Sequence, residues 1–316
     1  MTTIYLDQNK WIDLAKARLR LGVDGALKGS LAAITQRVAD GDWAVPLSAT
    51  HYMELARIKK PHRRRDLGET MWQVSRGQTL ASPSSMMHHE IDEALAKRIP
   101  GLQKRPFSLL GRGAAHAFGM PDRQYEVPAF ARPRLSREDL ATFQSMAQEV
   151  IERSLLTGST PDGIAAPTMG FTEHNARFMQ HLVDLPEILS DVPRDKWHDV
   201  LMALSIIDIK EPLAIALEHH ALEWSRLNGH DRTELSRLLL DLPSRVVDLH
   251  MHWQMAKNPN LRPKQNDLED WAALIPAAVY CDVMVCEKHF ADLLGRERFK
   301  PHAEVITDVR ELRNLL

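Results

Sequence analysis

The chain has 316 residues, of which 44% are hydrophobic and 26% are charged. This composition excludes a disordered protein and provides the apolar side chains for a sizeable core, in one large domain or two smaller ones. Lys and Arg number 40 against 42 Asp and Glu, which gives a net charge of -2. Charge alone therefore predicts no nucleic-acid partner, and such a partner would need a local basic patch.

The cysteine content and the hydropathy pattern indicate the cellular compartment. The two cysteines, Cys281 and Cys286, lie five residues apart in an apolar segment, which fits neither a disulfide framework nor a zinc motif. We therefore expect buried free thiols in a reducing compartment. The first residues lack the layout of a signal peptide, and no apolar run approaches the roughly 18 residues that cross a bilayer. The sequence predicts a soluble, cytoplasmic protein without a membrane partner.

The first predicted strand covers residues 4–6 and leads directly into a helix, on which Trp11 and Leu14 recur at helical spacing. Asp7 lies between them, at the carboxyl end of the strand. Ligands bind at that edge in open α/β sheets. An aspartate before a helix also caps its first free N–H groups, so both roles remain open for Asp7.

A regular alternation of strands and helices continues to about residue 85. The expected elements are a helix over 31–38, a strand over 43–48, a helix from residue 49 with Ser48 as its N-cap, a helix over 65–76 and a strand within 77–83. Glu54 lies on the helix that follows the second strand. This alternation is typical of a parallel sheet covered by helices.

The middle of the chain has a different pattern. Six helices are expected there, over 86–98, 137–156, 175–189, 196–209, 212–227 and 232–255, with breaks at 101–133 and 158–170. Strand signals return at 282–287 and 303–307, each after a helical segment. We therefore expect an α/β core built from residues 1–85 and 261–316, interrupted by an α-helical insertion over 86–260.

Acidic side chains bracket the last helix and strand of the expected core. Asp267 and Asp270 are three residues apart, which places both carboxylates on one helix face. Two like charges side by side are unfavourable, and a divalent cation would hold them together. Asp282 and Glu287 lie just before and just after the strand. A parallel sheet would gather these carboxylates and those of the N-terminal segment near one edge.

The segments "YLDQNKW", "LSATHYMELARI" and "NDLEDW…YCDVMVCEKHF" resemble the PIN-domain nucleases. The resemblance covers residues 1–85 and 261–316, and the helical middle has no counterpart in a minimal PIN domain. It implies a PIN-like parallel sheet and catalytic acids at Asp7 after the first strand and Glu54 on a later helix. The third acid is Asp267 or Asp270, and the fourth is Asp282 or Glu287. The predicted metal ligands are Asp7, Glu54, Asp270 and Asp282.

Carboxylates suit the metals that such nucleases use. Mg²⁺ and Mn²⁺ are hard cations that prefer oxygen ligands and share their remaining positions with water and substrate phosphate. One such water can be the nucleophile, and a pair of ions can stabilise both the attacking and the departing oxygen. The resemblance thus implies a metal-dependent endoribonuclease with Mg²⁺ or Mn²⁺ as cofactor and single-stranded RNA as substrate, with a toxin-like or defence-related role.

A basic segment follows the Glu54 helix directly. The run "RIKKPHRRR" provides candidate phosphate ligands at Arg57, Lys59, Lys60, Arg63, Arg64 and Arg65. A solvated helix and loop face is the alternative interpretation of this run. Asn9 and Ser48, each near a strand end, are candidates for orienting the nucleic acid or a water. The apolar residues of the segment 212–227 also allow contacts in a homo-oligomer or with a regulatory partner, although such a stripe is more often internal core.

Two other functions compete with the nuclease. Histidine pairs resemble the metal ligands of HD-domain phosphohydrolases; they are His88 and His89 with Glu90, His198 with Asp199, His219 with His220, and His230 with Asp231. Fifteen histidines produce such pairs by chance. The second alternative is a PIN-like module that binds RNA or protein and has lost its chemistry. The presence of several acids at the expected positions argues against it.

Overall fold

The computed structural model describes residues 1–121, 136–158, 185, 187–227, 232–258 and 265–315. The chain divides into two compact units. Unit 1 comprises Met1–Ser82, Leu110–Thr168 and Ile306–Leu316, and unit 2 comprises Pro83–Leu109 and Met169–Val305. The predicted insertion is therefore shared between both units, because α6 (Gly113–Phe118) and α7 (Arg137–Thr157) pack on the N-terminal elements.

Four strands form an α/β sheet in the order β2-β1-β5-β6, and helices flank it. The strands are β1 (Thr2–Leu6), β2 (Trp43–Ala44), β5 (Val283–Val285) and β6 (Glu304–Ile306). Thr2 pairs with Trp43 in a parallel ladder between β1 and β2. Within β1, the neighbouring residues Ile4, Tyr5 and Leu6 are at most 1% exposed, as expected for a short apolar strand that is covered on both faces. The predicted parallel α/β class is thus confirmed at the level of the sheet.

The third strand that we expected in this sheet belongs elsewhere. The strands β3 (Gln78–Leu80) and β4 (Leu110–Arg112) form a separate antiparallel pair, with Thr79 opposite Gly111. A single parallel bridge joins Thr79 to Leu47, where the Leu47 N–H donates to the Gln78 carbonyl. The expectation was wrong because the partner, β4, lies 30 residues further along the chain in a segment that carries no strand signal of its own.

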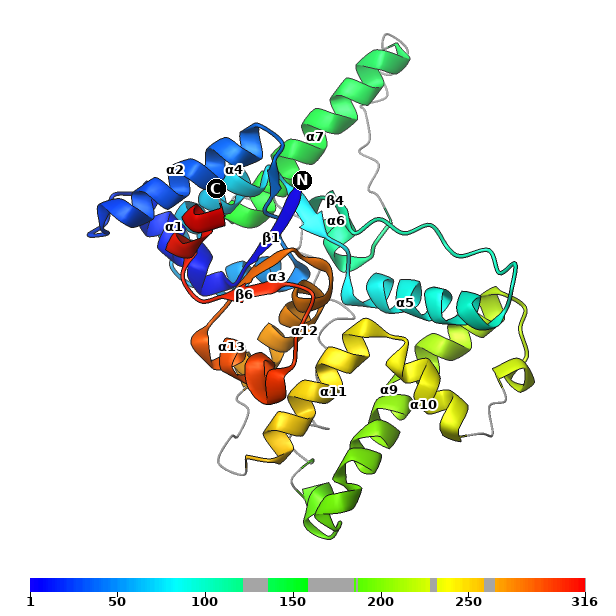
Figure 1. Cartoon of the computed structure of the whole chain (residues 1–316). Coiled ribbons are helices and arrows are strands. Elements are labelled where there is room, and N and C mark those ends of the chain that lie inside the picture. The colour runs from blue at the N-terminus through cyan, green and yellow to red at the C-terminus, as the bar shows by residue number, and fades with distance from the viewer. Residues whose placement is uncertain (122–135, 159–184, 186, 228–231, 259–264, 316) are drawn as a thin grey trace. The chain divides into compact units, whose positions relative to one another are not determined.

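The helices of unit 1 enclose a core around the first strand (Figure 1). They are α1 (Gln8–Arg18), α2 (Gly25–Ala39), α3 (Ala49–Arg57), α4 (Pro61–Ser75), α6 (Gly113–Phe118) and α7 (Arg137–Thr157). One end of α7 packs on α4, and the other projects beyond α2 and α4 (Figure 1). The two helices approach closely at Gly68, where a Cβ would lie 2.5 Å from the Leu156 carbonyl oxygen. An ion pair between Arg153 and Glu69 spans the same interface.

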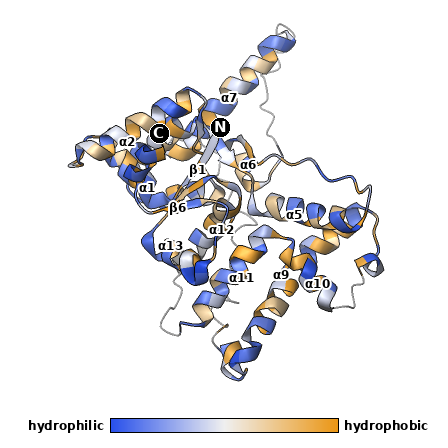
Figure 2. Cartoon of the chain, viewed as in Figure 1, coloured by the Kyte–Doolittle hydropathy of each residue, from blue (hydrophilic) through white to orange (hydrophobic). Residues whose placement is uncertain are grey.

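Unit 2 is built mainly from helices. They are α5 (Pro83–Arg98), α9 (Trp197–His219), α10 (Arg232–Leu240), α11 (Pro243–Ala256), α12 (Gln265–Tyr280) and α13 (Lys288–Gly295). Apolar and polar residues alternate along α9 and α11 (Figure 2). Apolar residues of α5, α9 and α10, among them Leu95, Ile209, Leu213 and Leu239, belong to one buried cluster. The helix expected over 196–209 continues through Pro212 as α9 and ends at His219, and the last residues of the segment expected as a helix over 212–227 form a separate 3-10 turn at Trp224–Leu227. The helix expected over 232–255 is instead broken into α10 and α11 before Pro243.

A buried ionic cluster ties together three segments of unit 2. The Asp92 carboxylate, whose side chain is 1% exposed, accepts hydrogen bonds from the Arg105 guanidinium at 2.6 Å and from His220 Nε2 at 3.0 Å. Burial opposes ionisation of Asp92, but the hydrogen bonds from Arg105 and His220 outweigh it and lower the pKa of Asp92 to about 2. Asp92 therefore carries its negative charge at neutral pH and is compensated by its neighbours.

Within the described part of the chain, none of the helices combines the length and the apolar composition that a membrane crossing requires. The helix expected over 175–189 lies almost entirely outside the described residues.

Candidate active site

Asp7 is positioned by the end of β1 and the beginning of α1. Its side chain is 4% exposed and accepts a hydrogen bond from the Gln8 N–H at 2.8 Å, and its backbone carbonyl accepts from Lys10 and Trp11. Asp7 is the N-cap of α1, so the capping role is realised. One carboxylate can cap a helix and bind a cation, since each oxygen has more than one lone pair.

His51 connects the end of β1 to the beginning of α3. Its Nε2 lies 2.9 Å from the Leu6 carbonyl oxygen, and its Nδ1 accepts a hydrogen bond from the Ser48 N–H at 2.9 Å. An N–H can only donate, so Nδ1 is unprotonated and the proton of the neutral ring is on Nε2, which donates to Leu6. The ring also stacks on Tyr5 and meets Trp11 edge-on.

Burial fixes His51 in this neutral form. The side chain is 1% exposed, and burial lowers the pKa of His51 to about 4 although the hydrogen bond to Leu6 raises it in part. No role for His51 is predicted from the sequence. The spacing Ser-x-x-His, from Ser48 to His51, is a signal for this role, because the side chain of residue N3 of a helix can reach back to the N–H of the N-cap.

Glu54 and Ser48 occupy α3 as expected. Ser48 is the N-cap of this helix and is 8% exposed. Glu54 lies within the helix and is half-buried. Residues three apart share a helix face, and His51 directs that face toward the end of β1. Glu54 lies one helical turn after His51, the residue that links α3 to the end of β1.

The remaining predicted acids belong to unit 2. Asp270 is half-buried on α12, and Asp282 and Glu287 are exposed on either side of β5. The side chain of Asp267 lies outside the described residues. Glu287 is the N-cap of α13, and the Asp282 carbonyl accepts a hydrogen bond from the Glu304 N–H.

Helix α12 buries an apolar face, and the predicted burial of the two thiols that follow it is confirmed. Trp271, Leu274 and Ala278 are at most 2% exposed, and Cys281 and Cys286 are fully buried. Burial and the neighbouring Asp282 carboxylate raise the pKa of the Cys281 thiol. Both cysteines thus belong to the core and not to a reactive site.

Among the residues that the structure describes, no group of three or more His, Cys, Asp and Glu side chains is arranged to hold a metal ion. Mg²⁺ is commonly held by only one or two carboxylates, with water and substrate phosphates in its other positions. The oxygen donors of Asp7 and Glu54 fit this smaller requirement in chemical type.

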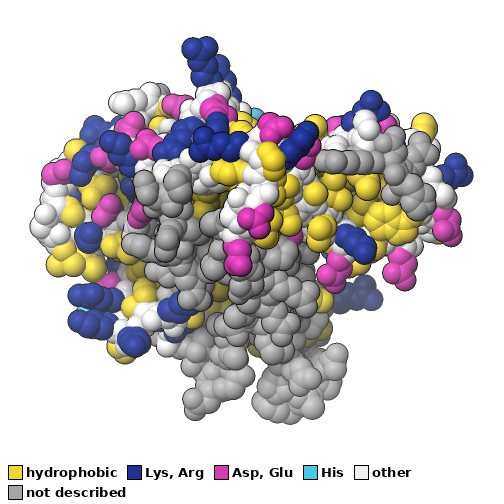
Figure 3. Space-filling model, turned by 90° about the horizontal axis from the view of Figure 1, so that it is seen from below, with side chains coloured by type: hydrophobic (Ala, Val, Ile, Leu, Met, Phe, Trp, Pro, Cys, Tyr) yellow, Lys and Arg dark blue, Asp and Glu magenta, His cyan; other side chains and the backbone are white. Residues whose placement is uncertain are grey.

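The basic run is split between a linker and a helix. Arg57 ends α3, Lys59 and Lys60 lie in the linker, and α4 begins at Pro61, where proline is favoured because its missing N–H would have no helical partner. The exposed members of the run are Arg57, Lys59, Lys60, Arg63 and Arg65. In the space-filling view of one face, Lys and Arg side chains are interspersed with Asp and Glu over the described parts (Figure 3).

Arg64 differs from its neighbours. It is half-buried and donates a hydrogen bond to the Leu155 carbonyl at 2.8 Å, and burial lowers its pKa. Its side chain also packs against Gly158, where a Cβ would lie 2.8 Å from Arg64 Cδ. Arg64 therefore helps to hold α7 on α4, and the exposed members of the run are the better phosphate ligands.

The histidine pairs have structural partners. His89 stacks on Phe107 with ring centres 4.1 Å apart, His198 meets Trp253 edge-on, and His220 bonds to Asp92. Glu90 accepts hydrogen bonds from Ser244 and from Tyr280, which are distant in sequence. His230 and Asp231 lie outside the described residues. These contacts give the described members of the pairs a role in packing.

Comparison with known proteins yields no relative. No protein-family model, no curated protein and no solved structure matches the chain.

Proposed function

We propose that this chain is a PIN-like, metal-dependent endoribonuclease that hydrolyses phosphodiester bonds of single-stranded RNA. The observation that carries the proposal is the coupling of β1 to α3 through His51. Asp7 directly follows β1, and Glu54 lies one turn after His51 on α3, so both carboxylates would meet at one end of β1. Both acids stand at the sequence positions that the PIN-domain resemblance assigns to them.

The carboxylates define the chemistry. Asp7 and Glu54 would hold Mg²⁺ or Mn²⁺ through oxygen, and the resemblance adds Asp267 or Asp270 and Asp282 or Glu287 as further ligands. A bound divalent ion supplies a water of lowered pKa as the nucleophile and stabilises charge on the phosphate. The protein needs no nucleophilic side chain of its own in this reaction.

The exposed basic side chains support an RNA substrate. Arg57, Lys59 and Lys60 follow Glu54 within six residues, and Arg63 and Arg65 are exposed on the first turns of α4. These side chains would contact the backbone phosphates and position the strand without reading its sequence. Asn9, exposed on the first turn of α1, would contact the strand near Asp7, whereas the buried Ser48 acts by capping α3.

The test is cleavage of a single-stranded RNA oligonucleotide in Mn²⁺ by Asp7→Asn. Asparagine caps a helix about as well as aspartate, so this variant keeps α1 and removes the charge. We expect the cleavage rate to fall by about 100-fold or more, and Glu54→Gln to behave alike. The matched control is Asp13→Asn, a half-buried acid on the same helix whose carboxylate pairs with Lys16; this variant should cleave at the wild-type rate.

Each alternative has its own outcome. Cleavage by Asp7→Asn at the wild-type rate, with unchanged circular dichroism and thermal melting, refutes the proposal. RNA binding without cleavage at high protein concentration identifies a binding module. Loss of Mn²⁺ binding in a His198→Ala and Asp199→Asn double variant, with binding retained in Asp7→Asn, identifies an HD-type site.

A further inference from the structure

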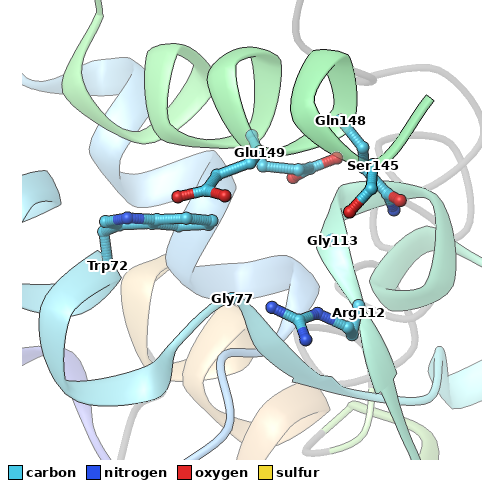
Figure 4. Close-up of a pocket in the computed structure, with 8 residues that line it drawn as sticks. Trp72, Gly77, Arg112, Gly113, Ser145, Gln148 and Glu149 are labelled. Atoms are coloured by element: carbon cyan, nitrogen blue, oxygen red, sulfur yellow. The ribbon is translucent and has the colours of Figure 1, made fainter. Parts of the chain in front are cut away.

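Unit 1 contains a cavity remote in sequence from the predicted acids. Its walls come from α7, from the end of α4 with the turn into β3, and from β4 with the start of α6 (Figure 4). Its volume is about 140 Å³. An engineered protein cavity of about 150 Å³ accepts benzene, so this space takes a planar group of about that size, and the rest of a larger ligand stays outside it.

Two glycines shape the walls. Gly77 has φ of +71°, and a Cβ there would lie 2.8 Å from the six-membered ring of Trp72. Gly113 has φ of +76°, and a Cβ there would lie 2.7 Å from the Glu152 carboxyl group. Both backbone conformations favour glycine. Glycine also leaves the room that the Trp72 ring and the Glu152 carboxyl group occupy, because it has no Cβ. The indole of Trp72 is thus held against the backbone as a flat, half-buried wall.

The two carboxylates of the cavity, Glu152 and Glu149, differ in their hydrogen bonding. Glu152 is 6% exposed and its Oε2 accepts hydrogen bonds from the Ala114 N–H at 2.8 Å and from the Tyr52 hydroxyl at 3.3 Å, so it anchors α6 and α3 to α7. Glu149, one turn earlier on α7, is exposed and makes no hydrogen bond or ion pair within the described part of the chain.

Arg112 enters the space from the wall opposite α7 (Figure 4). Its only hydrogen bond within the described residues goes from Nη2 to the Arg76 carbonyl at 3.0 Å, which leaves other guanidinium N–H groups directed at the cavity. Ser145 and Gln148 extend from α7 on the same side as Glu149 (Figure 4). The site therefore combines an aromatic face, a carboxylate acceptor and a guanidinium donor around a space for a planar group.

We propose that this cavity binds the guanine base of a single-stranded RNA. The choice of a nucleobase rests on the proposed nuclease function. Unstacked bases of single-stranded RNA stack on aromatic side chains and are read on their edges. Guanine offers N1–H and N2–H donors to the Glu149 carboxylate, and its O6 and N7 accept from arginine, the commonest specific contact to this base. The other three bases do not present both patterns.

A planar cation is the competing ligand. The guanidinium group of a peptide arginine also stacks on tryptophan and pairs with a carboxylate. Arg112 disfavours it, because a second positive charge in the same space is repelled. Guanine is neutral and uses Arg112 as a partner. The arrangement of charges thus favours the base.

The test is titration of the full chain with GMP, AMP, CMP and UMP by isothermal calorimetry, without added metal. We expect GMP to bind at least tenfold more tightly than the other nucleotides. Glu149→Gln should weaken GMP binding about tenfold, because one of two acceptors is lost from the edge of the base. Glu138→Gln, an exposed acid of the first turn of α7, is the matched control and should bind GMP as the wild type does.

Three results overturn this inference. They are equal affinity for all four nucleotides, equal GMP affinity of the Glu149→Gln and Glu138→Gln variants, and tighter binding of methylguanidinium than of GMP. The test is separate from that of the nuclease. RNA cleavage that depends on Asp7 without GMP binding refutes only the guanine site, whereas GMP binding that depends on Glu149 without cleavage refutes only the nuclease.

Discussion

The buried histidine that joins β1 to α3 predicts a specific dependence of stability on pH. His51 titrates at about 6.5 in the unfolded chain and at about 4 in the folded protein. Between these values the unfolded state binds a proton that the folded state excludes, so the free energy of unfolding falls as the pH is lowered. At about 1.4 kcal/mol per pKa unit, the loss between pH 7.5 and 4.5 is about 2.5 kcal/mol.

The structure gives the reason that the folded state excludes this proton. A proton on Nδ1 would face the Ser48 N–H, which already donates to that nitrogen at 2.9 Å. Protonation would therefore replace a hydrogen bond by two opposed donors in a buried site. The expected stability is fully present above pH 6.5 and is lost as the pH falls toward 4.

The variant His51→Gln isolates this contribution. Glutamine does not titrate, and it cannot restore both hydrogen bonds, so the variant should be less stable by about 1–3 kcal/mol at pH 7.5. Urea unfolding at pH 7.5, 6.5, 5.5 and 4.5 should show that the difference from the wild type shrinks by about 2.5 kcal/mol over this range. His62→Gln, which replaces an exposed histidine of α4, should keep the wild-type profile.

The comparison with His62→Gln makes the reasoning refutable. Other groups that titrate in this range contribute equally to the wild type and to both variants, and cancel in the differences. If the wild type and His51→Gln lose stability in parallel between pH 7.5 and 4.5, His51 is not the buried neutral histidine described here.

Two further perturbations test the packing of each unit. Arg105→Ala leaves the Asp92 carboxylate buried with one partner fewer, so urea unfolding should show that unit 2 is less stable by about 3 kcal/mol. Lys104→Ala removes an exposed ion pair and should change the free energy of unfolding by less than about 1 kcal/mol. Equal effects of the two substitutions would contradict the buried pair. Gly113→Ala combines a left-handed φ with a 2.7 Å approach of the new Cβ to the Glu152 carboxyl group, whereas Gly101→Ala has a positive φ in open space. The melting temperature should therefore fall further in Gly113→Ala than in Gly101→Ala. An equal fall would show that the side chains of the cavity wall move aside for the added methyl group.

Local signals explain why much of the N-terminal fold was predictable. The apolar run of β1 and the N-cap roles of Asp7 and Ser48 each depend on neighbours within a few residues. Such features are encoded by spacing and by the chemistry of one side chain. The structure follows the predictions at these places.

Long-range packing explains where prediction failed. Proline predicts a helix boundary, yet α9 continues through Pro212 because Ile209 and Leu213 are both buried in one apolar cluster that holds the two halves in line. The pairing of β3 with β4 joins segments that are 30 residues apart, and no local pattern specifies such a partner.

The candidate sites likewise combine residues that local signals predict with residues whose role depends on tertiary contacts. Asp7 and Glu54 were identified from a motif, because each follows a strand in the order that the PIN-domain resemblance requires. The role of His51 depends on a hydrogen bond to Leu6, 45 residues earlier, and became visible only with the tertiary contact. The cavity between Trp72, Arg112 and Glu149 exists only once α7 has packed on α4.

The measurement that tests the central claim most directly is anomalous diffraction from a crystal of the chain soaked in Mn²⁺. The account predicts a manganese peak within coordinating distance of carboxylate oxygens from both Asp7 and Glu54, and the same map identifies which acids of residues 267–287 complete the site. A well-ordered end of β1 with no peak at Asp7, in crystals that bind manganese elsewhere, would contradict the proposed nuclease.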